Sequence, residues 1–304
     1  MQDAAFFVAV HDAVLAKFKP LKFCEYGVVH RHEKSGVLHG LFRVREFTQD
    51  DAHLFVMPSQ IKENVYEILD FVELLMKAFG FEYELEISTK PQKAVGDDEV
   101  WDIATKALKD ALDEKGLKYG LDEGGGAFYG PKIDIKITDA LGRKWQCGTV
   151  QVDFNLPARF ELGYIDENNE KKQPVMLHRA ILGSFERFVG ILLEHTAGEL
   201  PFWICPTQVS IVPIGEAHAD YAKEILNLLR EADIDGEILD RNETLNKRIR
   251  TAEKQKVPLI IVLGDNEVSA RSVALRDRRV REQRNLGLDE FLNFVKAKLN
   301  EVNF

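Results

Sequence analysis

Residues 42–53 read FRVREFTQDDAH, and their alternation is that of a β-strand with an unusual polar face. Alternate residues of a strand point to the same side, so one face would carry Arg43, Arg45, Phe47, Gln49, Asp51 and His53. Such a face suits an anionic ligand with a planar base, because arginine binds phosphate and an aromatic ring stacks on a base. The alternative is a solvent-exposed strand with salt bridges.

Strands and amphipathic helices surround this stretch. Residues 21–31 and 41–55 are rich in aromatic and β-branched residues and flank a polar turn, which predicts two adjacent strands. The same criteria and helical periodicity predict a helix over 61–79, a strand over 83–89, a helix over 97–115, a hairpin of 132–139 with 143–154, and a helix over 180–195. Because the strands adjoin one another, we predict an antiparallel α+β domain over residues 1–203.

The pattern changes after residues 200–206 (LPFWICP), which contain two prolines and predict a linker. Strands are then predicted over 209–214, 236–239, 259–263 and 272–277, with helices over 217–231, 244–256 and 288–299. This order predicts a compact α/β domain over residues 204–304.

The composition is that of a soluble globular protein with about two domains, with 304 residues, 45% hydrophobic and 30% charged. No stretch approaches the roughly 18 apolar residues of a membrane span, and Met1-Gln2-Asp3 does not resemble a secretory signal. Cys24, Cys147 and Cys205 are odd in number and far apart, which favours a reducing compartment without disulfides. We therefore expect a cytoplasmic protein without a membrane partner.

Charge is unevenly distributed along the chain. The net charge of −10 argues against indiscriminate nucleic-acid binding. Residues 241–256 and 271–284 nevertheless each carry a net charge of +4, so the remaining 274 residues sum to −18. Two such stretches either attract a polyanion or form solvated surfaces.

Three stretches together resemble class II aminoacyl-tRNA synthetases. Residues 21–55 resemble motif 2, with residues 43–53 similar to threonyl-tRNA synthetases. Residues 123–134 (EGGGAFYGPKID) lead into residues 145–154 (WQCGTVQVDF), and residues 177–188 (LHRAILGSFERF) resemble motif 3. The resemblance covers residues 20–304 and implies a class II catalytic domain followed by an anticodon-binding domain.

The resemblance implies a threonine–tRNA ligase that activates threonine with ATP and Mg²⁺ and transfers it to tRNA(Thr). It assigns ATP binding to Arg31, Glu33, Arg43, Phe47, Gln146, Thr149 and Arg187, with the three arginines as the catalytic residues. It assigns threonine binding to Gln49, Asp51, Tyr129 and Gln151, and anticodon binding to Asn242, Arg250, Glu267 and Arg276.

The resemblance also implies a zinc ion, with His53 and His178 as two of its three protein ligands. The amino and hydroxyl groups of threonine would complete the coordination, which excludes valine but not serine. The third family ligand is a cysteine, whose position falls at about Gln2. Conceivable substitutes are His11 and Cys24, although a strand position favours Cys24 as a buried apolar residue.

Residues 1–19 do not resemble the family and instead predict an amphipathic helix. Neither motif 1, which builds the family homodimer, nor an editing region is recognisable, so we do not expect that dimer and do expect mischarging with serine. The alternative function is a catalytically inactive tRNA-binding fragment or paralogue. A zinc hydrolase is disfavoured because neither histidine lies in an HExxH motif.

Overall fold

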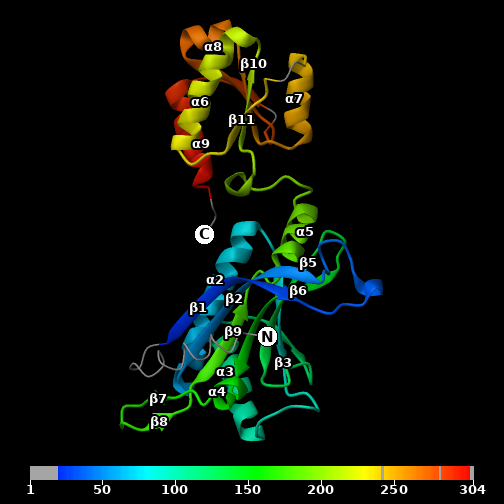
Figure 1. The fold of residues 1–304 in the computed structure, drawn as a ribbon, viewed down its shortest axis with the longest axis vertical. Helices are drawn as coiled ribbons and strands as arrows, with labels where there is room; N and C mark the ends of the chain where they lie inside the picture. The colour runs from blue at the N-terminus through cyan, green and yellow to red at the C-terminus, as the bar shows by residue number, and fades with distance from the viewer. Residues whose placement is uncertain (1–19, 241–242, 281, 302–304) are drawn as a thin grey trace. The chain divides into compact units, whose positions relative to one another are not determined.

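The structure, a computed structural model, describes residues 20–240, 243–280 and 282–301. The chain divides into two compact units, Met1–Glu194 and His195–Phe304 (Figure 1). The domain boundary expected after residue 203 stays a prediction. The helix predicted over residues 1–19, with Gln2 and His11, lies outside the described residues, and so does Asn242.

The first unit is built on a seven-stranded sheet in the order β1-β2-β9-β6-β5-β3-β4. Its strands are β1 (Leu21–His30), β2 (Glu46–Val56), β3 (Tyr83–Ser88), β4 (Tyr119–Asp122), β5 (Lys132–Thr138), β6 (Lys144–Asp153) and β9 (Val175–Ala180). Every neighbouring pair is antiparallel except β3 with β4. This confirms the predicted antiparallel α+β class.

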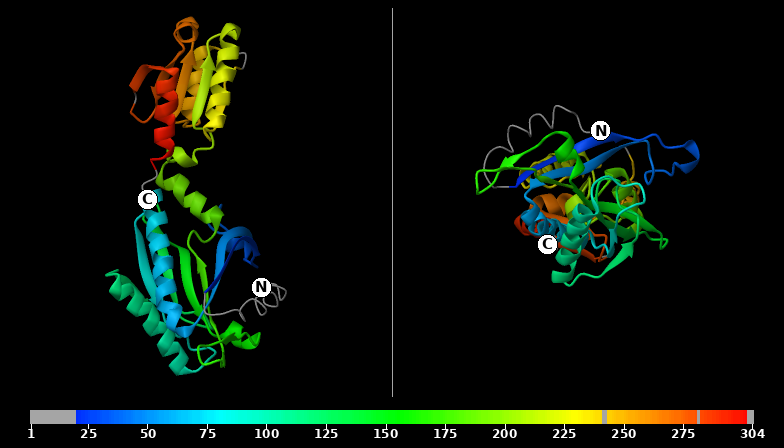
Figure 2. Two further views of the ribbon diagram at one scale, coloured as in Figure 1. Left: turned by 90° about the vertical axis from the view of Figure 1, so that its left-hand side faces the viewer. Right: turned by 90° about the horizontal axis from the view of Figure 1, so that it is seen from below.

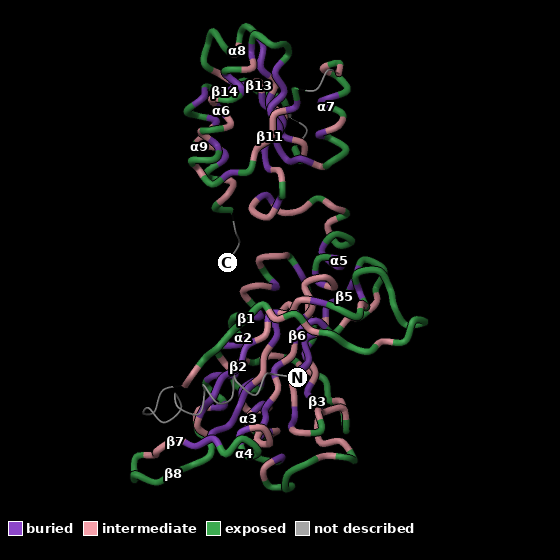
Figure 3. Tube along the Cα trace, in the orientation of Figure 1, coloured by how far each residue is buried: buried purple, intermediate pink, exposed green. Residues whose placement is uncertain are grey.

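Two long helices, α2 (Ile61–Phe79) and α3 (Asp98–Glu114), cover one face of this sheet (Figure 2). The apolar stripe of α2 is buried, with Val65, Val72 and Met76 inaccessible to solvent (Figure 3). Each such side chain contributes about 1.5–3 kcal/mol on burial. The helix ends where Gly80 adopts a left-handed φ of 73°.

Shorter elements complete the first unit. They are η1 (Ser35–Val37), η2 (Pro58–Gln60), α4 (Asn155–Arg159), the two-stranded ribbon of β7 (Tyr164–Ile165) with β8 (Lys171–Lys172), and α5 (Phe185–His195). The predicted hairpin is present as β5 and β6, with Lys132 opposite Gln151 and Thr138 opposite Lys144. Its polar side faces away from the helices, because Ile133, Ile135 and Ile137 occupy the core.

Two predicted boundaries in this unit are wrong. The strand expected from residue 41 begins at Glu46, so the alternation does not extend back to Arg45. The guanidinium of Arg45 instead donates to the carbonyl oxygen of Glu33 (3.0 Å) and to Ser35 Oγ (3.1 Å). It therefore stabilises the loop between the strands rather than extending the polar face.

The helix expected from residue 180 begins only at Phe185, and residues 175–180 form the unpredicted strand β9. Between them Gly183 adopts a left-handed φ of 72°. The carboxylate of Asp50 accepts hydrogen bonds from the amides of Ile181 and Gly183, both at 2.9 Å. These hydrogen bonds to β2 keep the segment before Phe185 out of the helix.

The second unit is a five-stranded sheet in the order β11-β10-β12-β13-β14, with helices on both faces. Its elements are η3 (Phe202–Ile204), β10 (Val209–Pro213), η4 (Glu216–His218), α6 (Ala219–Glu231), β11 (Gly236–Ile238), α7 (Leu245–Lys254), β12 (Leu259–Leu263), α8 (Asp265–Ala270), β13 (Ser272–Asp277), β14 (Glu282–Gly287) and α9 (Leu288–Leu299). The predicted α/β class is confirmed, although α8 and β14 were not predicted.

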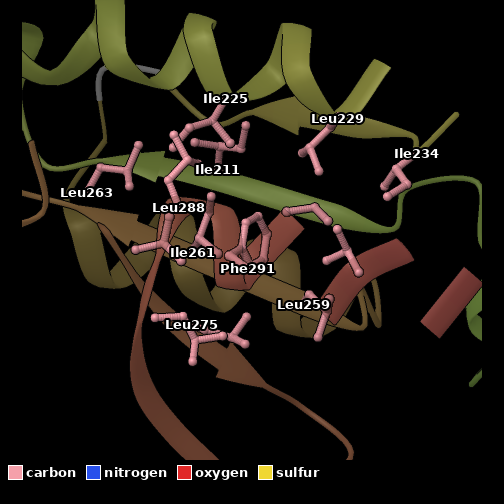
Figure 4. Packing of buried hydrophobic residues seen from close by; sticks show 14 of the residues in the cluster. Ile211, Ile225, Leu229, Ile234, Leu259, Ile261, Leu263, Leu275, Leu288 and Phe291 are labelled. Atoms are coloured by element: carbon pink, nitrogen blue, oxygen red, sulfur yellow. The ribbon is translucent and has the colours of Figure 1, made fainter. Parts of the chain in front are cut away.

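The main core of the second unit lies between the sheet and the helices α6 and α9 (Figure 4). Phe291 of α9 is fully buried there against strand residues such as Ile211 and Ile261. The helix α7 packs on the opposite face through Ile249 and Ala252. Among the residues that the structure describes, no helix is long and apolar enough to cross a membrane.

Candidate functional site

The polar face of the seven-stranded sheet is hollowed into a pocket of about 790 Å³. All thirteen residues that the resemblance assigns to ATP, threonine and zinc line it: Arg31, Glu33, Arg43, Phe47, Gln49, Asp51, His53, Tyr129, Gln146, Thr149, Gln151, His178 and Arg187. They come from motif 2, the β5–β6 region, β9 and α5. The sheet thus brings together residues far apart in sequence, while the role of each stays a prediction.

One end of the pocket is rich in arginine. Arg43 Nε and Nη2 each lie 3.1 Å from Glu33 Oε2. The Arg31 guanidinium carbon lies 5.0 Å from the centre of the buried Phe47 ring, a cation–π distance. A carboxylate and a stacked ring therefore orient two cations that remain able to meet an anion.

Arg187 supplies the third guanidinium at this end. Its Nε donates to the carbonyl oxygen of Phe42 (2.8 Å), and its Nη1 donates to that of Gln146 (2.7 Å). Burial lowers the pKa of Arg187, and the nearby charges of Arg43 and Arg31 lower it further. Three converging cations, positioned by a carboxylate, an aromatic ring and backbone oxygens, form a site for a polyanion.

The floor of the pocket carries a row of hydrogen-bonding groups. The Tyr129 hydroxyl donates to Gln151 Oε1, and Gln151 Nε2 donates to Thr149 Oγ1 at 3.3 Å. Burial raises the pKa of Tyr129 to about 12, with Asp153 and Asp51 adding to the effect. The phenol is therefore protonated at neutral pH.

Two histidines face each other at the other end. His53 and His178 are opposite partners in the β2–β9 register, and their ring centres are 5.0 Å apart. His178 Nε2 lies 2.9 Å from Asp153 Oδ2, and His53 Nε2 lies 3.6 Å from Asp51 Oδ2. Burial lowers the pKa of His53 to about 3, helped by His178 and Arg179, so its imidazole is neutral. Neutral imidazole is the form that binds a metal.

Known proteins match both units. Residues 1–196 match the family model of the tRNA synthetase class II core domain (G, H, P, S and T), and residues 208–298 match that of the anticodon binding domain. A crystal structure of the RNA-binding domain of threonyl-tRNA synthetase from Cryptosporidium parvum matches with a TM-score of 0.89 and 41% identity, covering 97% of this chain and 74% of that chain. The chain belongs to the threonyl-tRNA synthetase family.

Other members of this family are longer. The threonine–tRNA ligase of Campylobacter hominis is 79% identical over 299 residues, which are 98% of this chain and 49% of that protein. The chain thus spans about half the length of the curated relatives it matches. The prolyl-tRNA synthetase of Cryptosporidium parvum shares the fold, with a TM-score of 0.68 at 19% identity over 93% of this chain and 54% of that chain.

The two histidines fit the zinc ion that the threonyl-tRNA synthetase family implies, as two of its ligands. Within the described part of the chain, no group of three or more His, Cys, Asp or Glu residues is arranged to hold a metal. Cys24 is exposed rather than buried, so that prediction was wrong. Cys24 lies on the edge strand β1 opposite Ala52 of β2, so it is on the other sheet face from His53.

Carboxylates that organise the site were missed at the sequence level. Asp50 holds the turn before α5, although burial raises its pKa. Glu186 accepts from the amide of Thr48 at 2.9 Å. Asp50 shares the core-facing side of β2 with Ala52 and Leu54. A carboxylate among apolar positions was the signal that could have revealed it, because a buried charge requires partners.

The residues assigned to the anticodon lie on separate elements of the second unit. Arg250 is exposed on α7, whereas Asn242 lies outside the described residues. Glu267 Oε2 accepts from the amide of Gly264 at 2.9 Å and so caps α8. Arg276 is half-buried on β13, and its Nε has no hydrogen-bond partner among the described residues.

Part of the basic charge in this unit is structural. Arg248 is buried and donates to the carbonyl oxygens of Pro213 (2.6 Å) and Leu239 (2.9 Å). Arg271 pairs with Glu224, and Arg278 pairs with Glu199 at 2.6 Å. The two basic stretches are therefore not uniformly available to a polyanion.

Proposed function

We propose that this chain forms threonyl-adenylate from threonine and ATP and transfers threonine to tRNA(Thr). The observation that carries this proposal is the single pocket that all thirteen assigned residues line, in a member of the threonyl-tRNA synthetase family. The residues around it divide by chemistry, with cations at one end, hydrogen-bonding groups in the floor and imidazoles at the other end.

The arginine end suits the triphosphate of ATP with its Mg²⁺. We assign Arg31, Arg43 and Arg187 to the phosphates, Phe47 to stacking on adenine and Glu33 to its amino group. The threonine carboxylate attacks the α-phosphorus and pyrophosphate leaves, so no protein nucleophile is required. Positioning and neutralisation of charge then account for the catalysis.

The histidine end suits threonine beside a metal ion. His53 and His178 would supply two of the zinc ligands, and the third protein ligand is missing or not identified. Zinc there would bind the amino and hydroxyl groups of threonine, which valine cannot match because it has a methyl group instead. Gln49, Asp51, Tyr129 and Gln151 line the same end of the pocket and would orient the amino acid.

Metal analysis tests this assignment independently of catalysis. Protein purified without added metal should contain about one zinc per chain, by the stoichiometry of such sites. The change His53→Ala should remove most of it, whereas His30→Ala, at an exposed histidine paired with Glu46, should not. Equal zinc content in all three proteins would contradict the assignment.

The second unit is proposed to bind the anticodon of tRNA(Thr). Arg276 lies opposite Gln283 in the β13–β14 register, so both occupy one sheet face. Single-stranded bases are recognised through hydrogen bonds to their polar edges and through stacking on guanidinium groups.

The cytoplasmic location stays a prediction, and so does the expectation that the family homodimer is not formed.

Aminoacylation tests the complete function. The chain, supplied with ATP, Mg²⁺ and bacterial tRNA, should attach labelled L-threonine to the tRNA. If the tRNA binds but never acquires threonine, the chain is the inactive tRNA-binding fragment or paralogue instead.

A further inference from the structure

Asp134 is a buried carboxylate beneath the pocket that has no assigned role. It lies on β5 between Ile133 and Ile135, whose side chains point into the core, so its own side chain points to the pocket face. Its exposure is only 2%. A charge buried so completely requires several hydrogen-bonding partners.

Those partners are side chains from three strands. Oδ1 accepts from Gln146 Nε2 at 2.5 Å and from Thr149 Oγ1 at 3.2 Å. Oδ2 accepts from Ser88 Oγ at 3.1 Å and from the ammonium group of Lys132. A carboxylate offers about four acceptor positions, so Asp134 is fully engaged. Three of its four donors belong to residues that line the pocket.

An ionised carboxylate can only accept hydrogen bonds, and this fixes the direction of the row in the pocket floor. The Thr149 hydroxyl uses its single proton on Asp134, so its oxygen is left to accept from Gln151 Nε2 at 3.3 Å. The Gln151 amide must then turn its oxygen toward Tyr129, whose hydroxyl donates to it. No group among the described residues donates to the Tyr129 oxygen, so its lone pairs are available to accept a hydrogen bond.

We propose that Asp134 is a positioning residue that fixes the direction of this hydrogen-bond chain, so that Tyr129 presents an acceptor to the N–H groups of the substrate's amino group. An amino group whose lone pair is bound to a metal can only donate hydrogen bonds, so a reversed hydrogen-bond chain would direct an O–H group at another donor. The identity of the substrate rests on the proposed function, whereas the donor-to-acceptor direction of the hydrogen-bond chain does not.

The change Asp134→Asn tests this role because the side chain keeps its shape but gains a donor. Its amide can donate to Thr149 and allow the chain to reverse. We expect the Kd for L-threonine, measured by calorimetry, to rise about tenfold, the factor for one lost hydrogen bond. Asp139→Asn removes another buried carboxylate of the same hairpin, away from the pocket, and should leave this Kd unchanged.

A double-mutant cycle distinguishes an effect that acts through the hydrogen-bond chain from a general loss of packing. Thr149→Val breaks the chain one step beyond Asp134, so the double variant should bind L-threonine no more weakly than the weaker single variant. Unchanged binding by Asp134→Asn, equal weakening by Asp139→Asn, or fully additive effects in the double variant would each overturn the role.

Neutron crystallography tests the direction of the chain without any ligand. The Tyr129 hydroxyl hydrogen should point at Gln151 in the unmodified protein and lose that orientation in Asp134→Asn. The same orientation in both proteins would overturn the positioning role. If the unmodified protein binds no threonine, the proposed function fails, and the neutron structure still decides the role of Asp134.

Discussion

Phe47 is the residue to which we assign stacking on the adenine base. Its ring is buried, and the guanidinium carbon of Arg31 lies 5.0 Å from the ring centre. We expect Phe47→Ala to weaken ATP binding by about 1–3 kcal/mol, the scale of stacking between a base and an aromatic side chain. Calorimetry with ATP and Mg²⁺ measures this, and Phe71→Ala, at an exposed ring of α2, is the control. Unchanged affinity in Phe47→Ala would contradict the adenine assignment.

Asp139 shows how one residue ties the stability of the β5–β6 hairpin to pH. Burial opposes its ionisation, but hydrogen bonds from Trp145 and Arg143 outweigh this and lower its pKa from 3.8 to about 2. A lowered pKa stabilises the fold above pH 4, and the contribution disappears as the pH falls toward 2.

We therefore expect Asp139→Asn to lower the free energy of unfolding by roughly 1–2 kcal/mol at pH 7, with the difference shrinking at pH 3. Urea titrations of both proteins at the two pH values measure this. A difference of the same size at pH 3 would show that the charge of Asp139 does not carry the effect.

At the scale of elements, the start of β5 requires a glycine. A Cβ atom at Gly130 would stand 1.7 Å from the carbonyl oxygen of Val152, so the backbone carrying Tyr129 would have to move. We expect Gly130→Ala to destabilise the fold by about 1–3 kcal/mol, the cost of overpacking, and to lower threonine affinity. Gly36→Ala, where a Cβ would meet no atom within 4 Å, is the control for thermal unfolding. Equal melting of both variants would contradict the requirement.

Elements with a strong local pattern were predictable from sequence, and elements that depend on distant contacts were not. The helix α2 has the predicted bounds because its periodicity and Gly80 are local signals. The strand β14 was missed because it is polar and forms by pairing with β13. The start of α5 was misplaced because it depends on Asp50.

The same distinction applies to the site. The assigned residues could be found because three motifs resemble those of one family, and one pocket contains them. Asp134 and Asp50 were not identified from the sequence, because the roles we give them depend on partners in other segments of the chain. Sequence spacing does not show which side chains a sheet brings together.

At the scale of the whole molecule, activation and tRNA recognition are proposed to lie on different units. We expect Arg276→Ala to reduce charging of tRNA but to leave adenylate formation unchanged, because the pocket lies in the first unit. The control is Arg271→Ala, which also removes one positive charge, but from a residue that is already paired with Glu224. This variant should aminoacylate tRNA normally. Equal loss of charging and adenylate formation in Arg276→Ala would contradict this division.

Formation of threonyl-adenylate in the pocket of the first unit is the step on which the proposed function depends. The most direct test is threonine-dependent exchange of labelled pyrophosphate into ATP by the unmodified chain. We expect exchange with L-threonine and with L-serine, which both carry a hydroxyl group, and at most about one per cent of the threonine rate with L-valine. Exchange that does not exceed the background without amino acid would contradict adenylate formation in this pocket.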